Sequence, residues 1–331
     1  MMNYEIFKEV VKEKILDYMP PEYGKATVEI LHTNKVNKVK DGLTIRVPDS
    51  NVAPTVYLND LFDEYEKTGD LQSIMVKTAT LLDEASIKKP DFNTSLEAEN
   101  VRDKIVFQLI NTEQNKDMLS GMPHREFQDL SIIYRIAMKV DGQGVQSVMI
   151  SNQVAEGIGM NEEQLFKLAA ENTRRIFPPK VRSMNEIIRE MFMKDGMPEE
   201  IAEMMIGEMP EDRIMWVISN EQGINGAISM MYEDQLHKLA ETLETDLYIM
   251  PSSIHEVIAV SSDMGNPNEL AEMVAEINMS QVSLEERLSN QVYHYDKDLR
   301  KLSLATDTPN KRLDGLVAEP KLIYETKEQS R

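Results

Sequence analysis

Apolar positions recur with helical spacing in several segments of the chain, and each segment follows a residue that caps helix N-termini. Asn161 with Gln164, and Ser183 with Glu186, have the spacing of a capping box, in which each side chain accepts a hydrogen bond from the other residue's backbone N–H. Asn266 precedes a proline, which is favoured at the first helical position. The pattern predicts helices that begin after Asn3, Asp70, Asn161, Ser183 and Asn266.

Runs rich in β-branched and other apolar residues lie between these helices and predict strands. Single strands are predicted at residues 26–32, 43–47, 55–58 and 104–110. Hairpins are predicted at residues 130–151, turning at Asp141–Gly142, and at 214–232 around the turn NEQGING. Residues 247–251 and 256–261 form a third hairpin, unless they are one long strand bent in the middle. An amphipathic helix follows each predicted hairpin, at 161–176, 234–243 and 267–277. We therefore predict an α+β fold of recurring strand–strand–helix units with antiparallel sheets.

Prolines and methionines suggest how the chain is divided. Pro178–Pro179 ends one predicted helix, and the helical stretch after Ser183 is rich in methionine. Apolar periodicity is lost beyond about residue 301, which is typical of a loosely held terminus. We predict two α+β lobes joined by a helical connector: an N-terminal lobe at 1–180, a Met-rich connector at 181–212, a C-terminal lobe at 213–300 and a loosely ordered tail at 301–331.

The connector offers a candidate partner-binding surface. Methionine is flexible and fits irregular apolar surfaces, so a Met-rich amphipathic stretch can bind varied partner helices. Met191, Met204 and Met205 are the candidate contact residues. The alternative is that these methionines pack against their own protein.

Composition narrows the class of protein. Hydrophobic residues make up 41% of the 331 residues and charged residues 28%, which is typical of a globular chain with a core. There is no cysteine, which excludes disulfides and cysteine-ligated metals. The net charge of −21 opposes direct binding to nucleic acid. The charge either serves solubility, which the spread of the acids along the chain favours, or indicates a basic partner.

No sequence feature indicates a membrane protein. The first 16 residues mix acidic and basic side chains without a long apolar run, so we expect no secretory signal. No stretch approaches the roughly 18–20 apolar residues that a membrane span requires. We expect a cytoplasmic protein without membrane contact.

The stretch MPSSIHEVIAV, residues 250–260, combines hydroxyl, imidazole and carboxylate groups at Ser252, Ser253, His255 and Glu256. If it is a strand, alternate residues face opposite sides, so Glu256 points away from His255. Ser253 and His255 then stand nearly 7 Å apart, given about 3.3 Å per residue, whereas a nucleophile and its base need about 2.6–3.2 Å. We predict that His255 completes hydrogen bonds at a strand end. The alternative is a hydrolytic or transfer site.

A second polar cluster lies in the loop MPHREFQD, residues 122–129, just before a predicted strand. His124, Arg125, Glu126 and Asp129 form either an ion-pair cluster that holds the loop or part of a site. A catalytic centre would require this loop to meet the 252–256 strand, with His124, Asp129, Ser253, His255 and Glu256 as candidate residues.

Cofactor and metal signals are weak. GIGMNE, residues 157–162, precedes a helix, but a third glycine is missing and Glu162 and Glu163 would repel a phosphate. The five histidines show no metal-ligand spacing. We expect neither a cofactor nor a metal.

Five segments together resemble a family of uncharacterised bacterial proteins, found mainly in gut anaerobes and classed as a domain of unknown function. The segments are VAPTVYLNDLFDEY, KIVFQLINTEQNKDML, MPHREFQDLSIIYRI, EEQLFKLAAENTRR and DLYIMPSSIHEVI. The resemblance implies a cytoplasmic α+β protein and carries no assigned activity, cofactor or catalytic residue. The sequence favours a non-catalytic intracellular protein that binds another protein. The alternative is a hydrolase or transferase with a histidine–carboxylate site.

Overall fold

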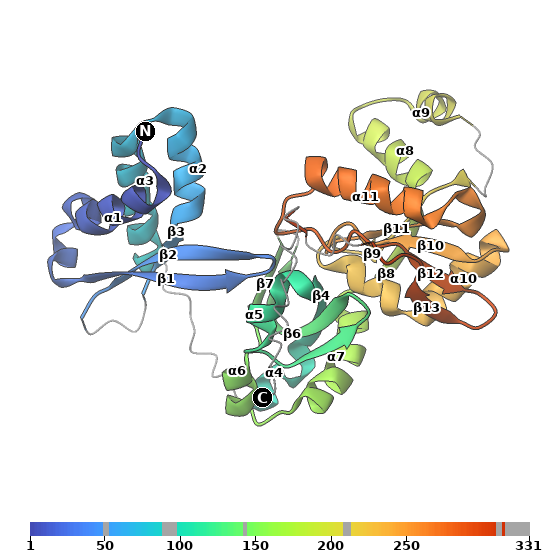
Figure 1. The fold of residues 1–331 in the computed structure, drawn as a ribbon, viewed down its shortest axis with the longest axis horizontal. Helices are drawn as coiled ribbons and strands as arrows, with labels where there is room; N and C mark the ends of the chain where they lie inside the picture. The colour runs from blue at the N-terminus through green and yellow to red at the C-terminus, as the bar shows by residue number, and fades with distance from the viewer. Residues whose placement is uncertain (49–52, 88–97, 142–143, 208–212, 309–312, 315–331) are drawn as a thin grey trace, which may run out of the picture. The chain divides into compact units, whose positions relative to one another are not determined.

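The computed structural model describes residues 1–48, 53–87, 98–141, 144–207, 213–308 and 313–314. The chain divides into two compact units, Met1–Asn100 and Val101–Arg331. The boundaries expected at residues 180, 212 and 300 all fall inside the second unit. The fold is α+β with three antiparallel sheets, as predicted (Figure 1).

The first unit packs three helices on a small antiparallel sheet. Its strands are β1 (Thr27–Lys35), β2 (Lys38–Arg46) and β3 (Thr55–Tyr57), in the order β1-β2-β3. Its helices are α1 (Tyr4–Lys14), α2 (Leu58–Thr68) and α3 (Leu71–Ile87). Phe7, Leu43, Leu58 and Ile74 bring these elements into one buried core. The Asn3 side chain caps α1 by accepting the Ile6 N–H, as the sequence predicts.

The second unit begins with an antiparallel sheet in the order β4-β6-β5, with β7 paired to β6. Its strands are β4 (Ile105–Asn111), β5 (His124–Phe127), β6 (Leu130–Asp141) and β7 (Gly144–Met149). Its helices are α5 (Lys116–Leu119), α6 (Asn152–Gly157) and α7 (Glu162–Ile176), and the short α4 (Ala98–Val101) spans the boundary of the two units. The β6–β7 hairpin is confirmed, although residues 142–143 of its turn lie outside the described part of the chain.

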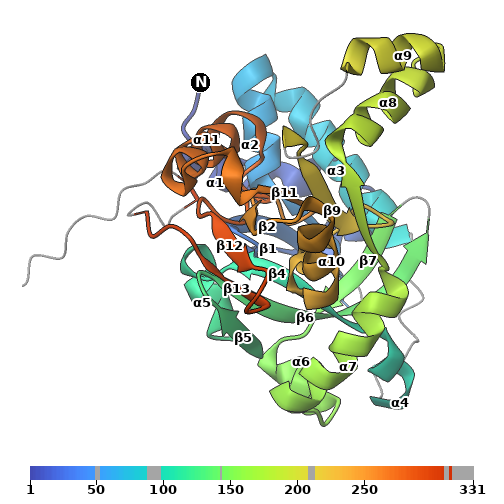
Figure 2. The ribbon, with the colours of Figure 1, turned by 90° about the vertical axis from the view of Figure 1, so that its right-hand side faces the viewer.

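A six-stranded antiparallel sheet follows, in the order β13-β12-β10-β11-β9-β8. Its strands are β8 (Pro179–Ser183), β9 (Trp216–Asn220), β10 (Leu247–Met250), β11 (Val257–Ser261), β12 (Tyr293–Asp296) and β13 (Lys301–Leu304). Two helices belong to it, α10 (Glu233–Leu243) and α11 (Pro267–Gln281). The predicted β10–β11 hairpin is confirmed. Figures 1 and 2 show α11 lying along one face of this sheet.

Strand alternation assigns the two helices to opposite faces of the six-stranded sheet. Ala271 and Val274 of α11 pack against Met250 and Val260. The partly buried Ile258 packs with the same cluster and pairs with Val217, so Val217 faces α11. Trp216 therefore points to the other face, where α10 lies.

Two sequence predictions fail in this unit. Residues 227–232 do not form a strand: residues 227–231 belong to a buried 3-10 helix, Gly226–Met231, and Tyr232 caps its end, so the strand–strand–helix unit is absent there. A short apolar run cannot be distinguished from buried helix by its periodicity. The expected loose tail is also wrong at its start, because residues 301–304 form β13 and the Thr306 hydroxyl hydrogen-bonds to Gln291 at 2.9 Å.

Candidate functional site

The predicted connector folds as a helical hairpin that leaves the edge strand β8. α8 (Met184–Lys194) starts with a capping box: the Ser183 hydroxyl accepts the Glu186 N–H at 3.1 Å, and the Glu186 carboxylate accepts the Ser183 N–H at 3.0 Å. α9 (Glu199–Ile206) starts after Pro198. We call residues 184–207 the α8–α9 hairpin. The remaining connector residues 208–212, including Met209, lie outside the described part of the chain.

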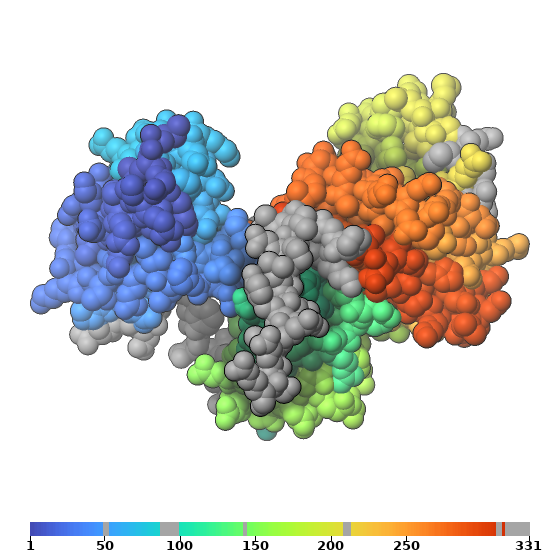
Figure 3. Space-filling view, in the orientation of Figure 1, coloured from blue at the N-terminus to red at the C-terminus, as the bar shows by residue number. Residues whose placement is uncertain are grey.

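Several apolar side chains of the α8–α9 hairpin are exposed to solvent, whereas Ile187, Ile188 and Phe192 of α8 are half-buried. α8 buries no side chain, and α9 buries Ala202 alone among its residues. The exposed fraction is 58% for Met191, 81% for Met204 and 62% for Met205. Met193 and Ile201 are exposed as well. Figure 3 shows the hairpin as a raised part of the surface of the second unit.

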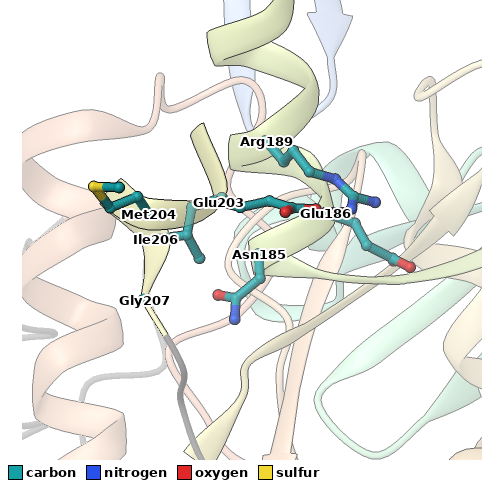
Figure 4. Close-up of a pocket in the computed structure, with 7 residues that line it drawn as sticks. All are labelled: Asn185, Glu186, Arg189, Glu203, Met204, Ile206 and Gly207. Carbon is teal, nitrogen blue, oxygen red and sulfur yellow. Dashed lines mark ion pairs between the residues drawn. The ribbon is translucent and has the colours of Figure 1, made fainter. Parts of the chain in front are cut away.

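A pocket of about 630 Å³ opens between the two helices of the hairpin. It is lined by Asn185, Glu186, Arg189, Glu203, Met204, Ile206 and Gly207. Arg189 of α8 and Glu203 of α9 form an ion pair at 3.5 Å, and Glu203 extends toward α8 while Met204 points away from it (Figure 4). The pocket therefore combines an ion pair and other polar groups with two apolar side chains, those of Met204 and Ile206.

Charge on the hairpin is predominantly negative. Its acidic residues are Glu186, Glu190, Asp195, Glu199, Glu200 and Glu203, and its basic residues are Arg189 and Lys194. A hydrogen bond from Arg182, at 2.6 Å, lowers the pKa of Glu190, so this carboxylate is ionised at neutral pH. The hairpin therefore presents methionines bordered by acids.

His255 lies in a bent connection rather than in a strand, because β11 begins only at Val257. Its Nδ1 accepts the backbone N–H of Asn225 at 3.2 Å, and its backbone N–H donates to the Ser253 hydroxyl at 3.0 Å. The carboxylate near His255 is Glu286, at 3.6 Å from Nε2. These contacts use the serine oxygen and one imidazole nitrogen to hold backbone groups, which favours a structural role.

Asp129 joins the turn after β5 to the segment before β12. Its carboxylate accepts hydrogen bonds from the hydroxyls of Ser289, at 2.5 Å, and of Tyr293. Burial and the Asp129 charge raise the pKa of Tyr293 well above 10.0, so the phenol remains a donor. The Phe127 and Tyr293 rings stack at 6.1 Å between centroids. Asp129 therefore takes part in a packed, hydrogen-bonded contact.

The loop expected to meet the 252–256 segment approaches it through a third segment. The Ser289 N–H donates to the Pro251 carbonyl at 2.8 Å, so Ser289 bridges Asp129 to the end of β10. His124 bonds through Nδ1 to the Met122 carbonyl at 2.9 Å. Glu256 is exposed and lines a different cavity, with Lys180 and Arg182. Of the five candidate catalytic residues, Ser253 and His255 contact each other, whereas His124, Asp129 and Glu256 each have other partners or neighbours.

Arg125 also has a structural partner that the sequence did not identify. Its guanidinium makes hydrogen bonds of 3.1 and 2.8 Å to Glu162 at the start of α7, and it lies 3.8 Å from the centre of the Phe166 ring. The Tyr134 hydroxyl donates to the same carboxylate. This network connects β5 and β6 to α7. It supports the interpretation that the polar residues of the loop form an ion-pair cluster that holds the loop in place.

Sequence reasoning missed the residues that complete the His255 surroundings, namely Asn225, Gly226 and Glu286. Gly226 is close-packed: a Cβ there would stand 2.5 Å from the His255 carbonyl oxygen and 2.2 Å from the Ser219 hydroxyl. The two glycines in NEQGING were the sequence feature that could have indicated this contact, because glycine allows another segment to approach the backbone closely. Glu286 follows His255 by 31 positions, and no local spacing indicates that contact.

The helices of the described residues include none long and apolar enough to cross a membrane.

Comparison with known proteins identifies a family without a function. A family model described as "Family of unknown function (DUF5688)" matches residues 4–297. No curated protein and no solved structure matches the chain. The bacterial, gut-anaerobe source implied by the resemblance stays a prediction. Since the match covers most of the chain, this protein belongs to the DUF5688 family of unknown function.

Proposed function

We propose that this protein is a non-catalytic binding protein whose α8–α9 hairpin takes up a basic amphipathic helix of a partner protein. One observation carries the proposal: α8 is a capped amphipathic helix with no buried side chain. Amphipathic helices are stabilised mainly by burying their apolar face, so α8, whose apolar side chains are half-buried or exposed, has less packing than such helices usually have.

The apolar side chains supply the driving force. Fully burying a methionine side chain contributes about 1.5–3 kcal/mol. Met191, Met204 and Met205 are each more than half exposed. Met204 lines the pocket, Met205 follows it in sequence, and Met191 lies two positions after the pocket residue Arg189. The flexible thioether side chain adapts to different apolar partners, which suits a binding surface rather than a fixed core.

The charges select the kind of helix. Carboxylates that border an apolar surface favour lysine and arginine beside the apolar face of the bound segment. A helix places its apolar anchor residues at positions i, i+3, i+4 and i+7, so its apolar face packs on the hairpin. The flanking lysines and arginines then reach the carboxylates at the rim of the surface. The net charge of −21 steers a basic partner toward the molecule.

The test uses an amidated peptide of about 14 leucine and lysine residues with the apolar residues at helical spacing. Isothermal titration should show saturable binding, and Met204→Ser/Met205→Ser should weaken it about thirtyfold, from about 1 kcal/mol lost at each methionine. Met264→Ser/Met273→Ser is the matched control, because both residues are partly exposed elsewhere in the second unit. This control should bind as the wild type does.

A control peptide of the same composition, with strictly alternating leucine and lysine, distinguishes binding of an amphipathic helix from attraction by net charge alone. It carries the same charge but cannot form an amphipathic helix. Equal binding of both peptides, or equal loss in the two double variants, would reject the hairpin as the binding surface.

A further inference from the structure

Strand β8 is one edge of the six-stranded sheet, and its outer side presents main-chain groups. Among the described residues, β8 pairs with β9 alone, on its inner side. The Pro178 carbonyl and the Met184 N–H bond to the β9 side, at 3.0 and 2.8 Å. Antiparallel pairing alternates, so even-numbered residues bond to β9 and the N–H and C=O of Val181 point away from it. An unpaired edge of this kind is a template for another strand.

A groove of about 410 Å³ runs between this edge and helix α10. β8 and β9 contribute Pro179, Lys180, Val181 and Trp216, and α10 contributes Gln235, Lys238, Leu239 and Thr242. Val181 and Trp216 are half-buried and Leu239 is buried, so the floor is apolar. The indole N–H of Trp216 is shielded from solvent and has no acceptor among the described residues.

The opposite face of β8 carries cations. Lys180 and Arg182 alternate with Val181 and line a second cavity, of about 230 Å³, on the other side of the strand. That cavity also contains Glu221 and Glu256, but both belong to the β9 and β11 side of β8. Strands are spaced about 4.8 Å apart, so Lys180 and Arg182 lie nearer to an added strand than these acids do. Arg182 already bonds to Glu190, and an incoming carboxylate would share it.

We propose that β8 and α10 form a peptide-binding site that takes an extended segment of a partner protein with the pattern acidic–apolar–acidic. The central residue exchanges main-chain hydrogen bonds with Val181 and places its side chain in the groove, against Trp216 and Leu239. Its two neighbours point to the other face, opposite Lys180 and Arg182, because side chains alternate along a strand. This surface adjoins the α8–α9 hairpin through Ile187 and the Arg182–Glu190 ion pair, but it uses none of the exposed methionines of the hairpin.

The chain contains its own reporter. It has one tryptophan, Trp216, which lines the groove, so tryptophan fluorescence reports binding there directly. The probe is the peptide Ser-Thr-Glu-Ile-Glu-Thr-Ser with an acetylated start and an amidated end. Titration should give a saturable change in Trp216 emission, and the peptide with lysine in place of both glutamates should give at least tenfold weaker binding. Bulk attraction to a chain of charge −21 would favour the lysine peptide instead.

Two charge reversals localise the site. Lys180→Glu on β8 should weaken binding of the Glu-Ile-Glu peptide about tenfold, because attraction becomes repulsion. Lys301→Glu, at an exposed lysine of β13, the other edge strand of the same sheet, should change it less than twofold. Val181→Pro removes the outward N–H donor and should abolish the fluorescence change, with the far-ultraviolet circular dichroism spectrum as the check on folding.

Three results would overturn the proposed peptide site at β8 and α10. Absence of a saturable fluorescence change, equal binding of the two peptides, or equal effects of the two charge reversals would each overturn the proposal. The hairpin variant Met204→Ser/Met205→Ser should bind the Glu-Ile-Glu peptide as the wild type does. Loss of binding in that variant would show that the peptide occupies the hairpin and not the edge of the sheet.

Discussion

Helices α7 and α8 begin with the same local device and end in opposite surroundings. In α7, Asn161 and Gln164 exchange hydrogen bonds of 3.0 Å in each direction, as Ser183 and Glu186 do in α8. α7 buries Leu165, Ala169, Asn172 and Thr173, whereas α8 buries none. The capping residues determine where a helix starts, but burial depends on what lies opposite its apolar face.

The opposing elements account for the difference. The Thr173 hydroxyl accepts the Phe107 N–H of β4 at 2.9 Å, and the Asn172 amide donates to the Ile105 carbonyl at 3.1 Å, so α7 is fastened to a sheet. α8 packs on the edge strand β8 and on α9, which buries only Ala202 among its own residues. The comparison teaches that an amphipathic pattern predicts a helix with an apolar face, and that only the tertiary structure tells whether the protein itself covers that face.

The strongest test of this comparison truncates one apolar side chain in each helix. Leu165→Ala in α7 removes a fully buried side chain and should cost about 2–5 kcal/mol of unfolding free energy, from lost burial and the cavity left behind. Met191→Ala in α8 should cost less than about 0.5 kcal/mol, because this side chain is already in solvent. Urea unfolding followed by circular dichroism measures both. Similar losses would mean that α8 is packed in solution.

A pair of glycine substitutions sharpens the contrast between close-packed and open positions. Gly226→Ala should cost about 1–3 kcal/mol or more, because the new methyl group meets the His255 carbonyl at 2.5 Å and the Asn220 backbone nitrogen at 2.8 Å. Gly157→Ala, at the end of α6, has no atom within 4 Å and should be neutral or slightly stabilising. If both variants unfold at the same urea concentration, the turn at Gly226 is looser than described.

The first unit extends the comparison to charge. Burial alone would raise the pKa of Asp41, but hydrogen bonds from Tyr4, Lys8 and His32 outweigh it and hold the pKa below the ordinary 3.8. The resulting stability is present above the unfolded-state pKa and is lost as the pH falls through the lowered folded-state pKa. Asp41→Asn should therefore cost about 1–2 kcal/mol at neutral pH, and this deficit should shrink below about pH 4. A deficit that stays constant from neutral pH to pH 3 would contradict the assignment.

The sequence predicts local structure better than it predicts contacts. Capping residues predicted the starts of α1, α7, α8 and α11, turn residues predicted the β6–β7 hairpin, and apolar runs predicted β10 and β11, because these signals act within a few residues. The 3-10 helix Gly226–Met231 was missed, since its conformation depends on the approach of Gly226 to His255, 29 positions away.

The candidate site divides in the same way. Met191, Met204 and Met205 were identified from composition and helical spacing, and their exposure is a tertiary property that no spacing reveals. The polar residues behaved differently. Asp129 bonds to Tyr293, which lies 164 positions later, and His255 lies near Glu286 rather than the adjacent Glu256. Such pairs arise from strand order and loop packing, which one sequence without its fold does not specify.

Hydrogen exchange of the backbone amides tests the central claim most directly, because it reads α7 and α8 in one experiment. In the free protein, amides of α7 should be strongly protected and those of the α8–α9 hairpin weakly protected. Saturation with the basic leucine–lysine helix should raise protection in the hairpin and leave α7 unchanged. Equal protection of α7 and α8 in the free protein, or added protection outside the hairpin, would contradict the account.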